Sequence, residues 1–300
     1  MKIGLGLPLS GAWAGPDAIA RVAERAEELG FAELWTFQRL AIADGDELAP
    51  VYGSVLDPLV TLAFAAARTE RVRLGVAIVN LPFVAPAHLA KQAASLDVLS
   101  RGRLDLGLGT GWSAVEFALT GSDGDRRGAR TLEYVSILRS FWADDVARFE
   151  GEFYTVSPAR MLPKPVQRPG VPILLGGSAE SALRRAGRIA DGWVSRSATD
   201  LSTIADQVAI VRQAAERAGR DPSALRIVTR GVTRLGGTRD KRLTGTASQI
   251  RADAEWLADQ GVTELFYDLN WDPLIGSPDA DPTVAAARAE EIMDSLAPGR

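Results

Sequence analysis

The chain has 300 residues, and its hydrophobic fraction of 46% and charged fraction of 24% are those of an ordinary globular protein. It contains no cysteine, which excludes disulfides, thiolate metal ligands and a cysteine nucleophile. Its one histidine, His88, stands near an expected helix start, where packing or capping explains it, so no metal site is predicted. A net charge of −4, with arginine and glutamate interspersed, argues against nucleic-acid binding.

The chain begins directly with a strand pattern and has neither a signal peptide nor an apolar run long enough to cross a membrane. We therefore expect a cytoplasmic protein that acts on a small-molecule substrate.

Hydrophobic patterns predict eight strands that alternate with eight helices. The strands are expected over residues 3–7, 33–37, 72–79, 104–111, 171–175, 192–195, 226–233 and 264–270. The helices are expected over residues 17–29, 57–69, 89–99, 131–142, 179–190, 201–218, 246–261 and from 281 onward, with a small hairpin at 148–154. This alternation predicts an α/β fold, a (β/α)₈ TIM barrel, as a single domain over residues 1–300. The long loops follow strands two, four, seven and eight, so we expect the functional face at the carboxyl ends of the strands.

Three glycines at a spacing of two mark the fourth strand: Gly107, Gly109 and Gly111. They leave one strand face without side chains, either for a ligand or for the close packing of barrel side chains or a crossing strand. Residues 109–114 also fit a loose dinucleotide fingerprint, G-x-G-x-x-A, but this match is weak so far from the first strand.

The residues expected at the carboxyl ends of the strands are poor in acids and bases and rich in glycine, amide, hydroxyl and tryptophan. This composition favours a planar aromatic ligand over metal-assisted hydrolysis. Gly176-Gly177-Ser178 opens a helix, where bare backbone N–H groups bind phosphate, although a routine turn explains it as well. The tryptophans that follow strand ends are expected to face substrate, namely Trp13, Trp112 and Trp271. Those inside strands, Trp35 and Trp193, are expected in the core.

Several motifs in order resemble the bacterial luciferase-like monooxygenase superfamily over nearly the whole chain. They are Ala90-Lys91-Gln92, Leu96-Asp97-x-Leu99-Ser100-x-Gly102-Arg103, Gly107-x-Gly109-x-Gly111-Trp112-x-x-x-Glu116-Phe117, Pro163-Lys164-Pro165-Val166-Gln167-x-Pro169, Gly176-Gly177-Ser178 and Asp191-Gly192-Trp193. The similarity is closest to the actinobacterial coenzyme F-420-dependent oxidoreductases, and a sister branch uses FMN.

The resemblance implies a cofactor at the mouth of the barrel: coenzyme F-420, an 8-hydroxy-5-deazaflavin, or alternatively FMN. It implies a non-prolyl cis peptide at Ala77-Ile78 that backs the ring. The other implied cofactor contacts are Asn80 beside it, Gly109, Thr110 and Gly111 along the ring, and Gly176, Gly177 and Ser178 at the phosphate. A homodimer and a possible separate flavin or deazaflavin reductase are also implied.

Two positions depart from the family pattern. Gln38-Arg39 stands where many members have an acid followed by a catalytic histidine, and Trp112 replaces a glutamate of sugar-phosphate-oxidising relatives. Arginine stays protonated, so Arg39 is predicted to stabilise negative charge on a substrate rather than to donate a proton. Gln38 and Arg39 are the predicted catalytic residues, and sugar-phosphate oxidation is disfavoured.

We therefore predict a deazaflavin-dependent oxidoreductase that transfers a hydride to or from a small organic substrate. The alternatives are an FMN-dependent monooxygenase of a two-component system and a non-catalytic flavin-binding relative. The loops over residues 38–56 and 236–245 are expected to close over the ligand.

Overall fold

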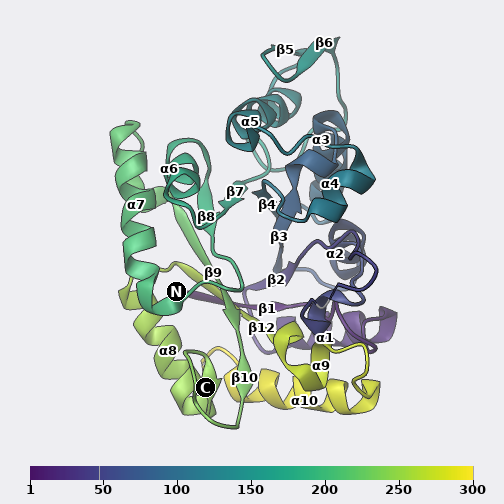
Figure 1. The fold of residues 1–300 in the computed structure, drawn as a ribbon, viewed down its shortest axis with the longest axis vertical. Helices are drawn as coiled ribbons and strands as arrows, with labels where there is room; N and C mark the ends of the chain where they lie inside the picture. The colour runs from purple at the N-terminus through teal and green to yellow at the C-terminus, as the bar shows by residue number, and fades with distance from the viewer. Residues whose placement is uncertain (47, 300) are drawn as a thin grey trace.

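Eight parallel strands close into a barrel, and helices surround it (Figure 1). The structure is a computed structural model that describes residues 1–46 and 48–299. Around the barrel the strands are β1 (Lys2–Gly6), β12 (Glu264–Asp268), β9 (Arg226–Val232), β8 (Gly192–Val194), β7 (Ile173–Gly176), β4 (Leu104–Gly109), β3 (Arg73–Asn80) and β2 (Glu33–Thr36). The predicted (β/α)₈ barrel is confirmed.

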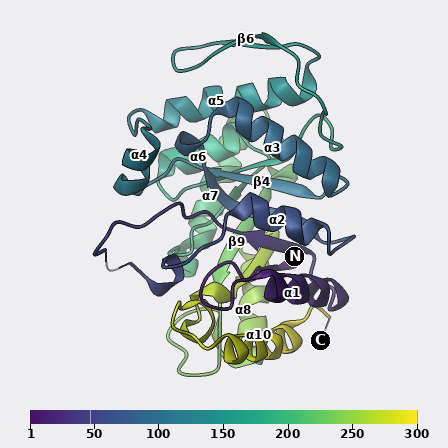
Figure 2. The same ribbon diagram turned by 90° about the vertical axis from the view of Figure 1, so that its right-hand side faces the viewer.

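The helices that link successive barrel strands are long enough to cover the outer faces of the sheet. They are α1 (Pro16–Glu28), α2 (Pro58–Ala66), α3 (Pro86–Leu99), α5 (Arg127–Ala143), α6 (Glu180–Ile189), α7 (Ile204–Arg217), α8 (Ala247–Asp259) and α10 (Pro282–Leu296). Figure 2 shows α3 and α5 side by side, with the hairpin of β5 (Ala147–Glu150) and β6 (Thr155–Ala159) beyond them. Side-chain caps mark the starts of two of these helices. Asp57 caps α2 by accepting hydrogen bonds from the backbone N–H groups of Leu59 and Val60, and Thr246 with Gln249 forms a capping box at the start of α8.

Some boundaries differ from the sequence predictions. The fourth strand ends at Gly109, because Gly111 has a left-handed φ of +72° that takes the chain out of the sheet. The hairpin is longer than predicted and turns within residues 151–154. The loops also hold short elements that the sequence patterns did not predict: α4 (Ala114–Thr120), α9 (Pro273–Gly276), β10 (Arg234–Leu235), β11 (Thr244–Gly245) and the 3₁₀ turns η1 (Pro50–Tyr52), η2 (Leu81–Phe83), η3 (Leu201–Thr203), η4 (Pro222–Ala224) and η5 (Leu269–Trp271). The dinucleotide fingerprint is wrong, since its glycines follow the fourth strand of a closed barrel.

An apolar layer fills the barrel interior, and we call it the barrel plug. Its members come from five strands and from the β3 bulge: Trp35, Ala77, Leu174, Val194, Val228 and Phe266, with Ile78 packed against them. Trp35 stacks on Phe266 with ring centroids 5.1 Å apart. Gly75 has no side chain because the Trp35 ring occupies that space. The plug closes the barrel below its mouth.

A cluster of buried charges lies at the opposite, amino-terminal face. Arg226 donates hydrogen bonds to Asp105, Glu264 and Glu33, and Arg73 donates to Asp105 at 2.6 and 2.8 Å. Burial, together with the charge of Glu264, raises the pKa of Glu33 to about 8. Burial opposes ionisation of Asp105 and Glu264 too, but hydrogen bonds and charges from the arginines hold both pKa values below their usual range.

Several motif residues that carry the family resemblance are structural. The Arg103 guanidinium donates to the carbonyls of Ala66 and Thr69 and to three further oxygens, which fixes the turn between α3 and β4. Gln167 donates to Asp97 at 2.7 Å and to the carbonyl of Leu104 at 2.8 Å. These contacts place β4 and the following link rather than a ligand. Among the helices of the described residues, none has the length and apolar character needed to cross a membrane.

Candidate functional site

The β3 bulge lies at the mouth of the barrel, directly above the plug. The Ala77-Ile78 peptide bond is cis, as the resemblance implied, and the pairing of β3 with β4 shifts register between Val76 and Val79. The Ile78 side chain lies against the neighbouring strands at Gly107, Gly109 and Gly176, and a Cβ on Gly109 would clash with its Cδ1. The glycine face of β4 therefore makes room for a side chain of the crossing strand.

Asn80 completes this surface beside Ile78. It pairs with Gly109 across the two strands, and its Oδ1 lies 3.5 Å from the place a Gly109 Cβ would take. Its backbone N–H donates to Oε1 of Gln38 at 2.8 Å. We call Ile78, Asn80 and Gly109 the apolar bed.

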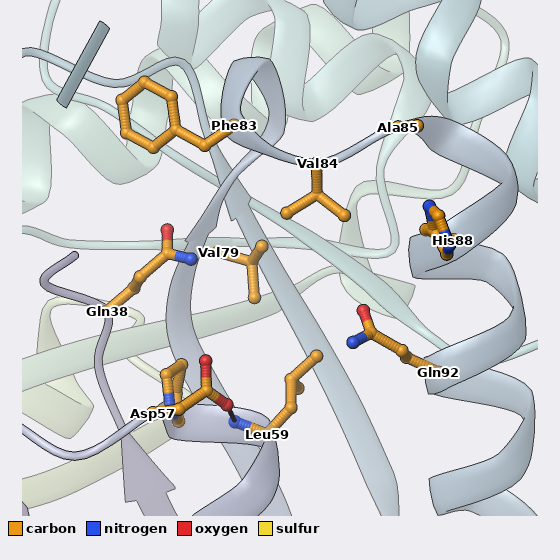
Figure 3. A pocket seen from close by; sticks show the side chains of 10 residues that line it. Gln38, Asp57, Leu59, Val79, Phe83, Val84, Ala85, His88 and Gln92 are labelled. Atoms are coloured by element: carbon orange, nitrogen blue, oxygen red, sulfur yellow. Dashed lines mark hydrogen bonds between the residues drawn. The ribbon is translucent and has the colours of Figure 1, made fainter. Parts of the chain in front are cut away.

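Gln38 and Arg39 point in opposite directions, as neighbours on an extended chain do. Gln38 faces a cavity of about 230 Å³ between the start of α2 and α3, together with Asp57, His88 and Gln92 (Figure 3). This cavity lies outside the barrel. The structure thus separates the two predicted catalytic residues and leaves Gln38 as a link between β2 and β3.

Arg39 is buried among aromatic rings, with 7% of its surface exposed. Its guanidinium carbon lies 4.5 Å from the ring centroids of both Tyr52 and Trp112, and Nη1 lies 3.3 Å from Oε2 of Glu116 on α4. Glu116 also accepts a hydrogen bond from the backbone of Leu40 at 2.7 Å. Within the described part of the chain, Nε and Nη1 of Arg39 have no hydrogen-bond partner. Nη1 already faces the Glu116 carboxylate, so Nε is the donor of Arg39 left for an oxygen atom of a ligand.

The three candidate pocket tryptophans do not share one environment. Trp112 is 61% exposed and stacks over Arg39, and Trp271 meets Tyr52 edge-on with centroids 5.6 Å apart. Trp13 is only 7% exposed and packs in the main core. The structure therefore brings Trp112 and Trp271 together around Tyr52 and leaves Trp13 apart from them.

The Gly176-Gly177-Ser178 turn enters α6 from the end of β7. Gly177 has a φ of +133°, and its carbonyl accepts a hydrogen bond from the Trp193 indole at 2.8 Å. Trp193 is otherwise in the core, as predicted, so the core fixes this turn. Glu180, in the first helical turn, is paired with Arg184.

Arg230 and Asp268 are site residues that the sequence reasoning missed. Arg230 follows Val228 by two residues on β9, and Asp268 follows Phe266 by two on β12, so both lie one layer above the plug. Arg230 donates to Asp268 through Nε at 2.7 Å and to the Ala77 carbonyl through Nη1 at 3.3 Å. A charged residue inside an apolar strand pattern was the only sequence signal.

Arg230 also lines a cavity of about 500 Å³ at the carboxyl ends of β8 and β9. Val232 and the loop residues 197–202 and 240–242 form its other walls. The cavity places open space beside a buried guanidinium at the barrel mouth.

These features fit a flat heteroaromatic ring better than a metal ion. The bed offers a flat, mostly apolar support, and buried donors of Arg39, Arg230 and Trp271 have no hydrogen-bond partner among the described residues. No group of three metal-binding side chains occurs in residues 1–46 and 48–299. The mouth is therefore suited to a flavin-type cofactor whose carbonyl and amide groups meet these donors.

Comparison with known proteins identifies the family. Residues 4–294 match the luciferase-like monooxygenase family. The chain is 33% identical over 249 residues to an uncharacterized protein of Mycobacterium bovis, and the aligned region covers 82% of this chain and 78% of that protein. It is 34% identical over 211 residues to the F420-dependent glucose-6-phosphate dehydrogenase of Nakamurella multipartita, and the aligned region covers 69% of this chain and 60% of that enzyme.

Among solved structures, the monooxygenase RslO1 from Streptomyces bottropensis superposes with a TM-score of 0.80 at 26% identity, over 99% of this chain and 98% of that one. The chain is an oxidoreductase and belongs to the luciferase-like monooxygenase family.

Proposed function

We propose that this oxidoreductase uses coenzyme F-420 to transfer a hydride to or from a small organic substrate. The observation that carries the proposal is the apolar bed of Ile78, Asn80 and Gly109 beside the buried guanidinium of Arg230, which donates to the Ala77 carbonyl. The similarity to a dehydrogenase named for this coenzyme favours the deazaflavin over FMN. When bound, the deazaflavin supplies a hydride acceptor or donor at its C5 atom.

The residues of the chain would bind and orient the reactants. The bed would support the ring, with Gly109, Thr110 and Gly111 along its edge. The phosphate would lie at the backbone N–H groups of Gly176, Gly177 and Ser178. The core contact from Trp193 to Gly177 supports this assignment, because it fixes the turn before a ligand arrives.

Arg39 would stabilise negative charge on a substrate oxygen through Nε, which has no hydrogen-bond partner among the described residues. Glu116 acts through Arg39 as a positioning residue, since it fixes both the guanidinium and the start of the loop. Trp112 and Trp271 would shape the substrate pocket. With Trp112 at the position of the glutamate in sugar-phosphate-oxidising relatives, the substrate is proposed to be a different class of molecule.

A second candidate is a flavin-dependent monooxygenase that works with a separate reductase. It is favoured by the end-to-end similarity to RslO1, a monooxygenase. A non-catalytic flavin-binding role is the third alternative, because Gln38-Arg39 rather than a histidine stands directly after β2. We further propose a single domain over residues 1–300 that works in the cytoplasm as a homodimer, for which light scattering of the purified protein is the test of assembly.

The deciding experiment is titration of the purified protein with F-420 and, in parallel, with FMN, followed by intrinsic tryptophan fluorescence. Trp112 and Trp271 lie at the mouth, so binding there is expected to quench emission. Preference for F-420 supports hydride transfer, preference for FMN supports the monooxygenase, and binding of neither contradicts both. Arg39→Lys and Arg39→Ala are then compared in turnover. Cofactor-dependent turnover that is lost in Arg39→Ala rules out the non-catalytic alternative.

A further inference from the structure

Arg230 and Asp268 form a polar layer between the barrel plug and the mouth. Both are buried, with 8% and 1% of their surfaces exposed. Arg230 lies with its guanidinium carbon 4.6 Å from the Phe37 ring centroid, which holds the plane of the side chain in place. The pair is therefore a fixed feature at the deep end of the site.

The donors of Arg230 are only partly used. Nε bonds Asp268, Nη1 bonds the Ala77 carbonyl, and Nη2 lies 2.7 Å from Oδ2 of Asp268. Yet Nη2 makes no hydrogen bond within the described residues. Asp268 takes at most one of the two N–H groups of Nη2, so the other is costly to the folded protein unless a ligand or water accepts it. Because Nη1 already contacts the bulge, Nη2 is within reach of a ring that lies on it.

We propose that Arg230, held in place by Asp268, recognises the pyrimidine edge of the cofactor ring, with Arg230 Nη2 donating to a ring carbonyl. This inference rests on the proposed function, in that a flavin-type ring lies against Ala77 and Ile78. The pyrimidine edge presents two carbonyl acceptors on either side of one N–H donor. Both oxygens of Asp268 are already engaged, Oδ2 by Arg230 and Oδ1 by the backbone N–H and Nδ2 of Asn270, so the carboxylate holds the guanidinium in place. The planar guanidinium then presents a fixed donor to a carbonyl of that edge.

The opposite ring edge fits the pair less well. In F-420 that edge carries an acidic 8-hydroxyl group, and in FMN it carries methyl groups. Asp268 already balances the charge of Arg230, so an oxyanion there would lie close to a carboxylate and be repelled. The pair is therefore assigned to the edge that both cofactors share.

The test compares cofactor binding by the wild type and Arg230→Lys, which keeps a positive charge for Asp268 but loses the planar fork. We expect the Kd values for F-420 and for FMN to rise together, by about 10- to 100-fold. The double variant Arg230→Gln with Asp268→Asn removes both charges at once and is expected to show the same loss without an unpaired carboxylate. Arg21→Lys, at an exposed position on α1, is the matched control and is expected to bind both cofactors as the wild type does.

Lumiflavin and 3-methyllumiflavin identify the edge directly, because the added methyl group blocks the pyrimidine N–H. The wild type is expected to bind the methylated ring at least tenfold more weakly, and Arg230→Lys to lose that discrimination. Unchanged Kd values in Arg230→Lys, selective loss of F-420 alone, or equal binding of the two lumiflavins would each overturn the assignment. If the wild type binds none of the rings, the proposed function fails and this assignment fails with it. Ring binding by the wild type without an effect of Arg230 overturns only the assignment.

Discussion

The buried carboxylate of Glu33 at the amino-terminal face makes the stability of the fold depend on pH. In the folded protein its pKa is about 8, against an ordinary value of 4.5. Between these two values the folded chain binds more protons at Glu33 than the unfolded chain does. Its contribution to stability is therefore fully present below pH 4.5 and is lost as the pH rises through 8.

The size of this loss follows from the shift in pKa. A shift from 4.5 to about 8 corresponds to at most about 5 kcal/mol. Glu264 in the same cluster has a lowered pKa, so it is ionised in both the folded and the unfolded chain above pH 5 and adds no pH dependence there. Arg226 can shift toward Glu33 when Glu33 ionises, which keeps the loss below this upper bound. We expect a net fall of about 2 kcal/mol in the free energy of unfolding between pH 5 and pH 9 from this group. For 300 residues that is a shift of about 3 °C in Tm.

Glu33→Gln mimics the protonated acid at every pH and can still accept the hydrogen bond from the Trp35 indole. We expect its Tm to match the wild type near pH 5 and to exceed it by about 3 °C at pH 9. Thermal melts from pH 5 to 9 measure this, with Glu255→Gln as the exposed control of equal charge change. Parallel Tm curves for the wild type and Glu33→Gln would refute the reasoning.

Three further substitutions test the mouth. Gly109→Ala pushes a Cβ against the side chain of the bulge, so we expect cofactor Kd to rise at least about tenfold and stability to fall by about 1–3 kcal/mol, by titration and urea unfolding. Trp193→Phe removes the hydrogen bond to Gly177, and we expect it to lower the free energy of unfolding by about 1 kcal/mol. It is also expected to weaken the binding of FMN more than the binding of riboflavin, which lacks the phosphate. An unchanged ratio of the two Kd values would disprove a phosphate site there. Glu116→Ala leaves Arg39 buried without its partner, with an expected loss of about 3–5 kcal/mol in urea unfolding; a loss below about 1 kcal/mol contradicts the buried pair.

The barrel was predictable because each strand and helix carries its own local signal. Continuous apolar runs marked the strands, and capping residues such as Asp57 and Thr246 marked helix starts. Short elements in the loops, such as α4, were missed because they are too short for a periodic pattern and depend on contacts with distant residues. Glu116 on α4, for example, meets Arg39 from a position 77 residues away in the chain.

The site was only partly predictable for the same reason. The bulge at Ala77-Ile78 followed from the family resemblance, but no local pattern shows that Ile78 occupies the glycine face of β4. Nor does the sequence show that Gln38 faces a cavity while Arg39 packs between Tyr52 and Trp112, or that Arg230 meets the Ala77 carbonyl across the barrel. These facts depend on closure of the sheet, which brings together strands far apart in the chain.

The bonds of Glu116 limit how the mouth can open. This one carboxylate holds both the guanidinium of Arg39 and the backbone of Leu40, so the loop after β2 and the helix after β4 are tied to each other at their bases. The two segments must therefore shift as one body, and any independent swing of the loop has to begin beyond Leu40. We therefore expect ligands to enter at the opposite rim, where the cavity beside Arg230 is lined by the loop residues 197–202 and 240–242.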